Sequence, residues 1–297
     1  MDSDNLRAIA LMVGAMAAFA VEDFLVKTIA GAMPVGQIVF VLAAGGAAVF
    51  AAICLRRGTP LLTRDLRHPY VLVRNLAEVG ATLCYVTALA MIPLSLVSAI
   101  LQATPIFVTM GAALWLREPV GWRRWSAVLV GLFGVLVILR PGLEGFEPTA
   151  LFAVAGAVNL AIRDVVSRRI PATIRSEQLS LWAYAFLAPA AALLAALTGG
   201  VAAASPATWA ILAVAVGVGA GAYMLLTTAT RLGDVTAVIP FRYSRLIFAL
   251  ILGVVFLGER PDPATLLGAA IVVGSGLYAW LRERRRVRAL SLARASA

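Results

Sequence analysis

Side chains that carry chemistry are scarce in this chain of 297 residues. It contains one histidine and two cysteines, and only 13% of its residues are charged. The sequence has no His-Glu-x-x-His, Gly-x-Ser-x-Gly or glycine-rich phosphate loop, and His68 and the cysteines lack metal-ligand spacing. These absences argue against hydrolysis, metal chemistry and ATP-driven pumping, so we expect no enzyme, no metal and no cofactor. Cys54 and Cys84 fall within apolar stretches, which predicts small buried side chains rather than a disulfide.

Long apolar runs are what the chain has instead. It is 62% hydrophobic and its mean hydropathy is +0.93, far from the balance of a soluble domain. Ten stretches approach the ~20 residues that cross a ~30 Å hydrocarbon core. We therefore predict an all-α integral membrane protein with ten transmembrane helices, at residues 6–27, 34–55, 69–91, 94–115, 122–139, 149–167, 178–198, 206–229, 236–256 and 264–281.

The chain repeats itself with a period of about 141 residues. Leu116 and Glu118 correspond to Leu257 and Glu259, and one residue further Glu22 corresponds to Asp164. Each repeat holds five spans, and an odd number makes the second copy enter the membrane from the opposite side. We predict two inverted five-helix repeats, 1–143 and 144–297, that together form one transport domain, as in many secondary transporters.

The net charge of +10 is distributed as in a membrane protein. With the N-terminus inside, the inner segments carry 18 Lys and Arg residues and the outer segments carry three. This positive-inside bias predicts a multi-pass protein of a bacterial inner membrane with both termini cytoplasmic, and argues against a nucleic-acid partner. The basic tail after Trp280 is then a topology anchor that faces the lipid bilayer. Small residues such as Gly217 and Gly221 favour packing within a monomer over a homodimer face.

Apart from those in the first or last three residues of a span, eight ionisable residues fall inside the predicted spans, where facing lipid would cost on the order of 20 kcal/mol in total. They must instead face one another, a neighbouring helix or water. Four lie toward span ends and are expected to form gate or structural ion pairs: Glu22, Asp23, Arg163 and Asp164. Nearer the membrane centre are Arg74 and Glu78 on the third span and Arg242 and Arg245 on the ninth.

The central charges predict a site for a zwitterion. Glu78 suits an ammonium group, and the forks of Arg242 and Arg245 suit a carboxylate. The substrate is then a small molecule such as an amino acid, in a cavity also lined by Tyr85, Gln102, Thr104, Tyr223 and Tyr243. The alternative is a purely structural salt bridge, Glu78 with Arg245 or Arg74 with Glu78. Pro105 and Pro240 are expected to kink their helices and to free backbone carbonyl groups, which are tolerated at this depth where they line a cavity.

The two halves resemble the drug/metabolite transporter superfamily, of the EamA type, over residues 6–281. The resemblance is carried by Ala88, Pro105, Leu116-Arg117-Glu118 and Gly134, and by Ala229, Leu257-Gly258-Glu259 and Gly274. Within it, the chain looks most like the YddG group of exporters of aromatic and other amino acids. The resemblance implies a central cavity lined by the first, third, fourth, sixth, eighth and ninth spans, alternating access, and structural roles for Glu118 and Glu259.

The sequence therefore predicts a secondary transporter that exports amino acids. An alternative is proton-coupled efflux of cationic aromatic drugs or other metabolites, for which Glu78 is the one central carboxylate. The arginines near Glu78 favour its charged form, which weakens that alternative.

Overall fold

The computed structural model describes residues 3–117, 121–143, 145–171, 173–232 and 238–295, and within these ranges the secondary structure is helical, without strands. Two short 3₁₀ segments occur, η1 (Arg64–Arg67) and η2 (Ile239–Tyr243). The α-helices are α1 (Ser3–Ile29), α2 (Val35–Arg56), α3 (Pro69–Met91), α4 (Leu94–Leu101), α5 (Thr104–Leu114), α6 (Trp122–Leu139), α7 (Ala150–Ser167), α8 (Ser176–Leu197), α9 (Pro206–Leu232), α11 (Ser244–Phe256) and α12 (Pro263–Ala295).

Eight of the predicted spans are long and apolar enough in the described residues to cross a membrane, with α4 and α5 counted as one span, Leu94–Leu114. The other two predicted spans are α3 and the combination of η2 with α11. Helix α3 carries both Arg74 and Glu78, and α11 has only 13 residues. Ten crossings therefore remain the prediction, and eight helices support it directly.

Burial in this fold is the reverse of that in a soluble protein. Large apolar side chains cover the outside, including Phe133 at 59% and Val255 at 67% exposed, whereas Asn75 is fully buried and Arg74 is 4% exposed. Apolar side chains are stable toward lipid, and polar ones must find partners within the bundle. This pattern identifies a multi-pass membrane protein.

Two spans are interrupted at the prolines for which the sequence predicted a kink. Pro105 lies in the first turn of α5, and Pro240 lies in the 3₁₀ segment that precedes α11. Because proline has no N–H and clashes with the preceding turn, carbonyl groups are released there. The Thr104 hydroxyl donates a 2.7 Å hydrogen bond to one of these, the Leu101 carbonyl.

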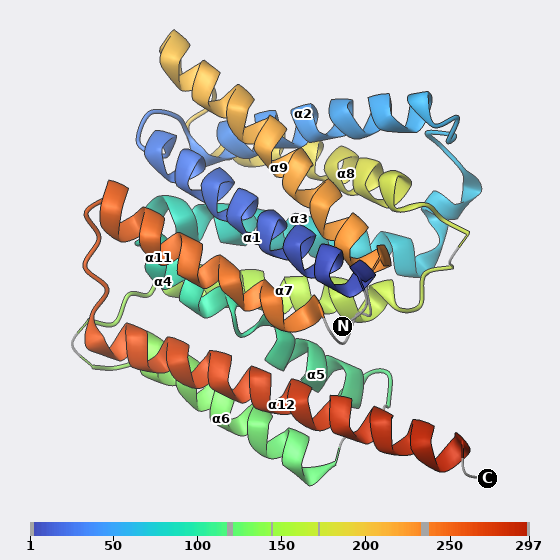
Figure 1. Cartoon of the computed structure of the whole chain (residues 1–297). Coiled ribbons are helices and arrows are strands. Elements are labelled where there is room, and N and C mark those ends of the chain that lie inside the picture. Colours follow the sequence, from blue (N-terminus) through green and yellow to red (C-terminus); the bar gives the residue numbers. More distant parts are fainter. Residues whose placement is uncertain (1–2, 118–120, 144, 172, 233–237, 296–297) are drawn as a thin grey trace.

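Each helix of the N-terminal half packs against a helix of the C-terminal half: α1 against α9, α2 against α8, α3 against α7, and α6 against α12. The two chain termini lie at the same end of the bundle, at the right of Figure 1. Helices α6 and α12 approach closely at Gly134 and Gly268, where an added Cβ at Gly134 would lie 3.0 Å from the Gly268 carbonyl oxygen. Small residues are required at this contact.

The loops at both ends are tied down by glutamines at equivalent positions. Gln37, at the start of α2, exchanges two hydrogen bonds with the backbone of Ala202. Gln178, at the start of α8, donates to the carbonyl of Pro60. The two glutamines are 141 residues apart, the period of the sequence repeat.

Glu259, expected to be structural, accepts the backbone N–H groups of Leu94 at 2.6 Å and Ser95 at 2.9 Å. It thus caps α4, whose own N-cap residue, Pro93, provides no side-chain hydrogen bond. Lys27 donates to the carbonyl of Ile92 at the end of α3. The repeat partner, Glu118, lies outside the described residues.

Candidate substrate site: a buried network of arginines and carboxylates

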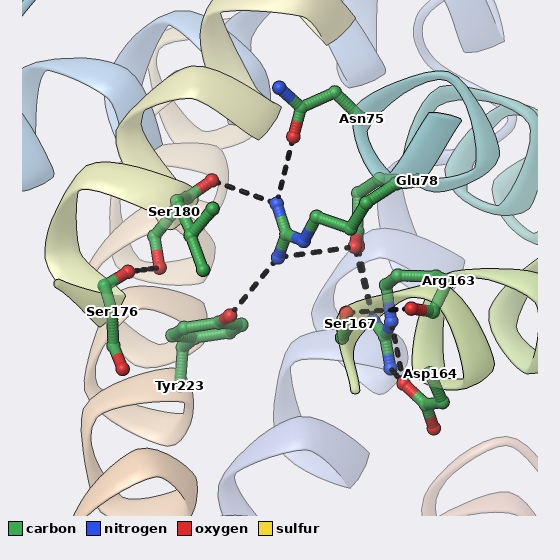
Figure 2. Close-up of polar contacts among 10 residues, drawn as sticks. Asn75, Glu78, Arg163, Asp164, Ser167, Ser176, Ser180 and Tyr223 are labelled. Atoms are coloured by element: carbon green, nitrogen blue, oxygen red, sulfur yellow. Dashed lines mark hydrogen bonds and ion pairs between the residues drawn. The ribbon is translucent and has the colours of Figure 1, made fainter. Parts of the chain in front are cut away.

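Arg163 on α7 bridges two carboxylates. Its Nη1 donates to both carboxylate oxygens of Glu78 on α3, at 3.3 and 3.2 Å, and its Nε and Nη2 donate to Oδ1 of Asp164, at 2.9 and 2.7 Å. Figure 2 shows Arg163 between these two acids. The close packing of α3 on α7 places the three groups together, and the arginine supplies hydrogen bonds and opposite charge to both carboxylates.

A second arginine extends this network toward α8 and α9. The Arg74 guanidinium is 3.8 Å from the Glu78 carboxylate, one helical turn away on α3. It also donates to Oδ1 of Asn75, to the carbonyl of Leu179 and to the hydroxyl of Tyr223 (Figure 2). Arg74 therefore connects α3 with α8 and α9, and its partners keep a nearly fully buried guanidinium stable.

A separate cluster surrounds Arg245 on α11. Its Nε and Nη2 donate to Oδ2 of Asp23 on α1, at 3.1 and 2.7 Å, and Nη2 also donates to the Tyr85 hydroxyl. The guanidinium carbon lies 5.1 Å from the ring centre of Phe19 and 5.5 Å from that of Tyr85. An ion pair between aromatic faces is stabilised by cation–π attraction as well as by charge.

The predicted grouping of Glu78 with Arg242 and Arg245 differs from the arrangement found. Glu78 pairs with Arg163 and Arg74, Arg245 pairs with Asp23, and Arg242 lies 3.7 Å from Asp164. Of the two structural salt bridges considered, the one between Arg74 and Glu78 is present. The prediction placed Arg163 and Asp164 apart from the central charges, but the long arginine side chain reaches across to Glu78.

Gln102 and Tyr243, equivalent residues in the two repeats, meet at the two broken spans. The Gln102 side chain donates a 3.1 Å hydrogen bond to the Tyr243 carbonyl, which is in the 3₁₀ turn before α11. Tyr243 is 9% exposed, and its hydroxyl, next to Gly276, is buried and has no hydrogen-bond partner among the residues that the structure describes. Thr104 binds its own preceding turn, as described above. These three residues therefore join the broken helices and do not line the pocket described next.

A pocket of about 370 Å³ lies between the C-terminal part of α2, the start of α8 and the C-terminal half of α9. Of these three helices only α9, the eighth predicted span, belongs to the cavity that the resemblance implied, and Tyr223 is the one predicted cavity residue that lines this pocket. The pocket is lined by Phe50, Ile53, Arg57, Ser176, Glu177, Ser180, Tyr223, Met224, Thr227, Thr228 and Leu232.

Aromatic rings and one buried acid mark the pocket. The Phe50 ring stacks on Tyr184 at 5.8 Å and meets Tyr223 edge-on at 5.6 Å. Glu177 is 6% exposed and is 3.5 Å from Arg57. The sequence analysis missed Phe50, Tyr184 and Glu177, because a single aromatic residue in an apolar span gives no signal until its neighbours are known.

The network can bind polar groups of either sign, but it offers no metal centre: no group of three His, Cys, Asp or Glu side chains is suitably placed among the residues that the structure covers. Arginines and carboxylates in a low-dielectric bundle bind ionised groups strongly, since water screens them little. The arrangement therefore suits recognition of a charged or zwitterionic molecule rather than bond-making chemistry.

Comparison with known proteins assigns the chain. The profile of the EamA-like transporter family matches residues 6–140 and again residues 148–280. The chain belongs to the EamA-like transporter family. It is thus a membrane transporter and not an enzyme, and the general part of the sequence-based assignment is confirmed.

Its relatives in this family have diverse cargoes. The chain is 32% identical over 213 residues to the riboflavin transporter of Rhizobium johnstonii, covering 72% of this chain and 70% of the relative. It is 26% identical to the S-adenosylmethionine uptake transporter of Rickettsia bellii, covering 75% and 76%. It is 28% identical to the pseudopaline exporter CntI of Pseudomonas aeruginosa, covering 86% and 89%. The YddG group does not appear among these names.

A solved crystal structure of another protein has the same fold. It superposes with a TM-score of 0.64 at 25% sequence identity, covering 93% of this chain and 98% of the other. The similarity therefore extends over both repeats.

Proposed function

We propose that this EamA-family transporter is a secondary carrier that exports amino acids or amino-acid derivatives by alternating access between two inverted five-helix repeats. The observation that carries the proposal is the set of four acidic and four arginine side chains within the spans, of which Asp23 and Arg74 are buried and the others are half-buried. Such groups are retained in a membrane interior where they serve a substrate or ion pathway.

The helix pairing supports the inverted repeat. If the halves exchange by the 141-residue register, α1 becomes α7 and α9 becomes α3, so the α1–α9 contact maps onto the α3–α7 contact. The glutamine contacts follow the same exchange to within one residue, because Gln37 maps onto Gln178 and its partner Ala202 maps onto Leu61, next to the Pro60 that Gln178 binds. Two interlocked halves of this kind move against each other around a fixed site in secondary transporters.

The charges support an amino-acid-type substrate. S-adenosylmethionine, cargo of the Rickettsia relatives, contains a methionine with ionised amino and carboxyl groups, whereas riboflavin carries no such pair. A site with both signs of charge matches the first kind of molecule. Export, the direction predicted from the sequence, has a precedent among the relatives in the pseudopaline exporter.

A second candidate, riboflavin, is favoured by one observation. The Rhizobium riboflavin transporter is 32% identical to this chain, and the pocket contains the Phe50 and Tyr223 rings, on which a flat heteroaromatic molecule can stack. The charge network, however, would have no ionised partner in riboflavin.

Counterflow in proteoliposomes tests these alternatives. Vesicles loaded with unlabelled L-phenylalanine, S-adenosylmethionine or riboflavin are exposed to a trace of the same labelled compound. Accumulation of labelled phenylalanine or S-adenosylmethionine, without accumulation of riboflavin, supports the proposal. Accumulation of riboflavin alone refutes it, and a strict need for a proton gradient would favour the drug-efflux alternative.

The membrane in which the carrier resides and its orientation there are also part of the proposal. The arginine-rich segments support a bacterial inner membrane with both termini in the cytoplasm, and the pocket between α2, α8 and α9 then opens toward the cytoplasmic end. Within the bundle, close helix contacts such as Gly134 on Gly268 account for the small residues, which supports a monomer.

A further inference from the structure

The Glu22 carboxylate lies against the backbone of α9 at Gly219. A Cβ added at Gly219 would overlap both carboxylate oxygens of Glu22, so no other residue type fits there without displacing them. Glu22 is half-buried on the face of α1 that packs against α9. Among the residues that the structure describes, none forms a hydrogen bond or an ion pair with this carboxylate.

The same place in the other half of the molecule is filled by a cation. In the repeat register Glu22 corresponds to Asp164, and Gly219 corresponds to Glu78. Asp164 and Glu78 are both bound by the Arg163 guanidinium, at 2.7 and 3.2 Å. The residue that corresponds to Arg163 is Val21, so the first half keeps one acid and lacks the positive charge.

Glu78 in one half and Gly219 in the other stand at equivalent positions, and this difference sets how much positive charge the site at Glu22 can accept. The Arg163 guanidinium is held between two carboxylates, those of Glu78 and Asp164. At the equivalent position in the first half the Glu22 carboxylate faces Gly219, which brings no second carboxylate. A residue with a Cβ at position 219 would fill the space beside Glu22. A single positive charge of modest size is what this half of the molecule requires for balance. An unpaired carboxylate at this depth is costly, and binding a cation offsets that cost.

Arg245 does not neutralise Glu22 by contact. It belongs to the Asp23–Tyr85 cluster, and the donors it uses are Nε and Nη2. Its Nη1 makes no hydrogen bond with the described residues and remains a donor for a carboxylate. Glu22 is adjacent to Asp23 in the chain, so an acceptor for an ammonium group and a donor for a carboxylate lie in one neighbourhood.

Helix α9 connects the aromatic pocket with Glu22. Gly219 and Tyr223 are four residues apart on α9 and share a face, separated by about 6 Å along the helix axis. Tyr223 lines the pocket and stands edge-on to Phe50. A molecule with an aromatic body in the pocket can therefore direct a positively charged end toward Glu22.

We propose that Glu22, facing Gly219, is the ammonium-binding residue for a substrate with an aromatic body, and that it does for the substrate what Asp164 does for Arg163. This assignment rests on the transport function proposed above and adds to it the residue that binds the positive group, in place of Glu78. Glu78 and Asp164 are structural partners of Arg163 in this proposal.

The test uses phenethylamine, which has an aromatic ring and an ammonium group but no carboxylate. Its binding to the purified full-length protein in detergent is measured by calorimetry for the wild type and for Glu22→Gln, Glu22→Asp and Glu147→Gln. Because the interaction is a charge-assisted hydrogen bond, we expect Glu22→Gln to weaken binding at least tenfold. Glu22→Asp should stay within a few-fold of the wild type, and Glu147→Gln, a control at an exposed glutamate in the loop before α7, should bind as the wild type does.

A second variant fills the site from within the protein. Val21→Arg supplies the guanidinium that the other half already has, so it should abolish phenethylamine binding, whereas Val21→Gln should not. Elution as a single monodisperse species shows that each variant is folded. Wild-type affinity in Glu22→Gln, or no phenethylamine binding to the wild type, overturns the assignment.

The transport function is judged separately. Counterflow of labelled substrate by the wild type depends on the carrier, whatever residue binds the ammonium. If counterflow occurs while Glu22→Gln binds phenethylamine normally, the site assignment fails and the carrier stands. If phenethylamine binding depends on Glu22 but none of the panel is transported, the ammonium site stands and the proposed function fails.

Discussion

Removing the Glu259 carboxylate should loosen the junction between the two halves. This side chain, from the loop between α11 and α12, accepts the N–H groups of Leu94 and Ser95 at the start of α4. Hydrogen bonds to a charged acceptor contribute about 1.5–3 kcal/mol each. Because Glu259 is half-buried, the lower end of that range applies to each of the two bonds, and Glu259→Ala should lower the free energy of unfolding by about 3 kcal/mol.

The conservative variant separates charge from shape. In Glu259→Gln one amide oxygen can still accept an N–H group, so the loss should be about half as large. Gly253→Ala should act like Glu259→Ala, because a Cβ at Gly253 would lie 2.6 Å from the Glu259 carboxylate and displace it. Thermal unfolding of the purified protein, followed by loss of monodispersity, measures these effects.

Glu147, an exposed glutamate in the loop before α7, provides the control. Glu147→Gln should unfold at the wild-type temperature. If Glu259→Ala and Glu147→Gln are indistinguishable, the two short hydrogen bonds contribute nothing measurable and the capping argument is wrong.

Three further predictions concern the network, a loop ion pair and a helix contact. Arg163→Met leaves Glu78 only with Arg74 at 3.8 Å and Asp164 only with Arg242 at 3.7 Å. Loss of the shared partner should lower the free energy of unfolding by about 3–5 kcal/mol, measured by unfolding in a denaturing detergent. A loss below about 1 kcal/mol would contradict a bridging role for Arg163. Burial raises the pKa of Asp262, but hydrogen bonds from Thr265 and Arg140 outweigh it and hold the pKa below its ordinary value. The stabilisation from Asp262 is therefore present above its unfolded-state pKa and is lost as the pH falls through its folded-state pKa. The difference in melting temperature between the wild type and Asp262→Asn should be constant from about pH 7 to 5 and should decrease only below about pH 4. A difference that disappears near pH 6 would exclude Asp262 as its cause. Gly134→Val should cost about 1–3 kcal/mol by forcing α6 from α12, whereas Gly217→Ala, where an added Cβ meets nothing within 4 Å, should be neutral; equal melting temperatures for the two variants would show that the close contact is not required.

The positions of the helices could be predicted from the sequence because hydrophobic length is a local property. The expected spans 69–91 and 122–139 have the same limits as α3 and α6. The breaks at Pro105 and Pro240 were also local, since proline removes a backbone donor wherever it occurs. The partners of Glu259 were not predictable, because Leu94 is 165 residues away and its N–H carries no sequence signal.

The sequence by itself determined that this protein is a bundle of membrane helices, that it consists of two related halves, and which charged residues must be satisfied inside. These properties depend on composition, period and the cost of charge in hydrocarbon. Only the tertiary structure decided which charge meets which: Arg245 meets Asp23, 222 residues away, and Glu78 meets Arg163, 85 residues away. The physical reason is that a salt bridge between helices depends on their relative rotation and depth, and these are set by the packing of all the spans together.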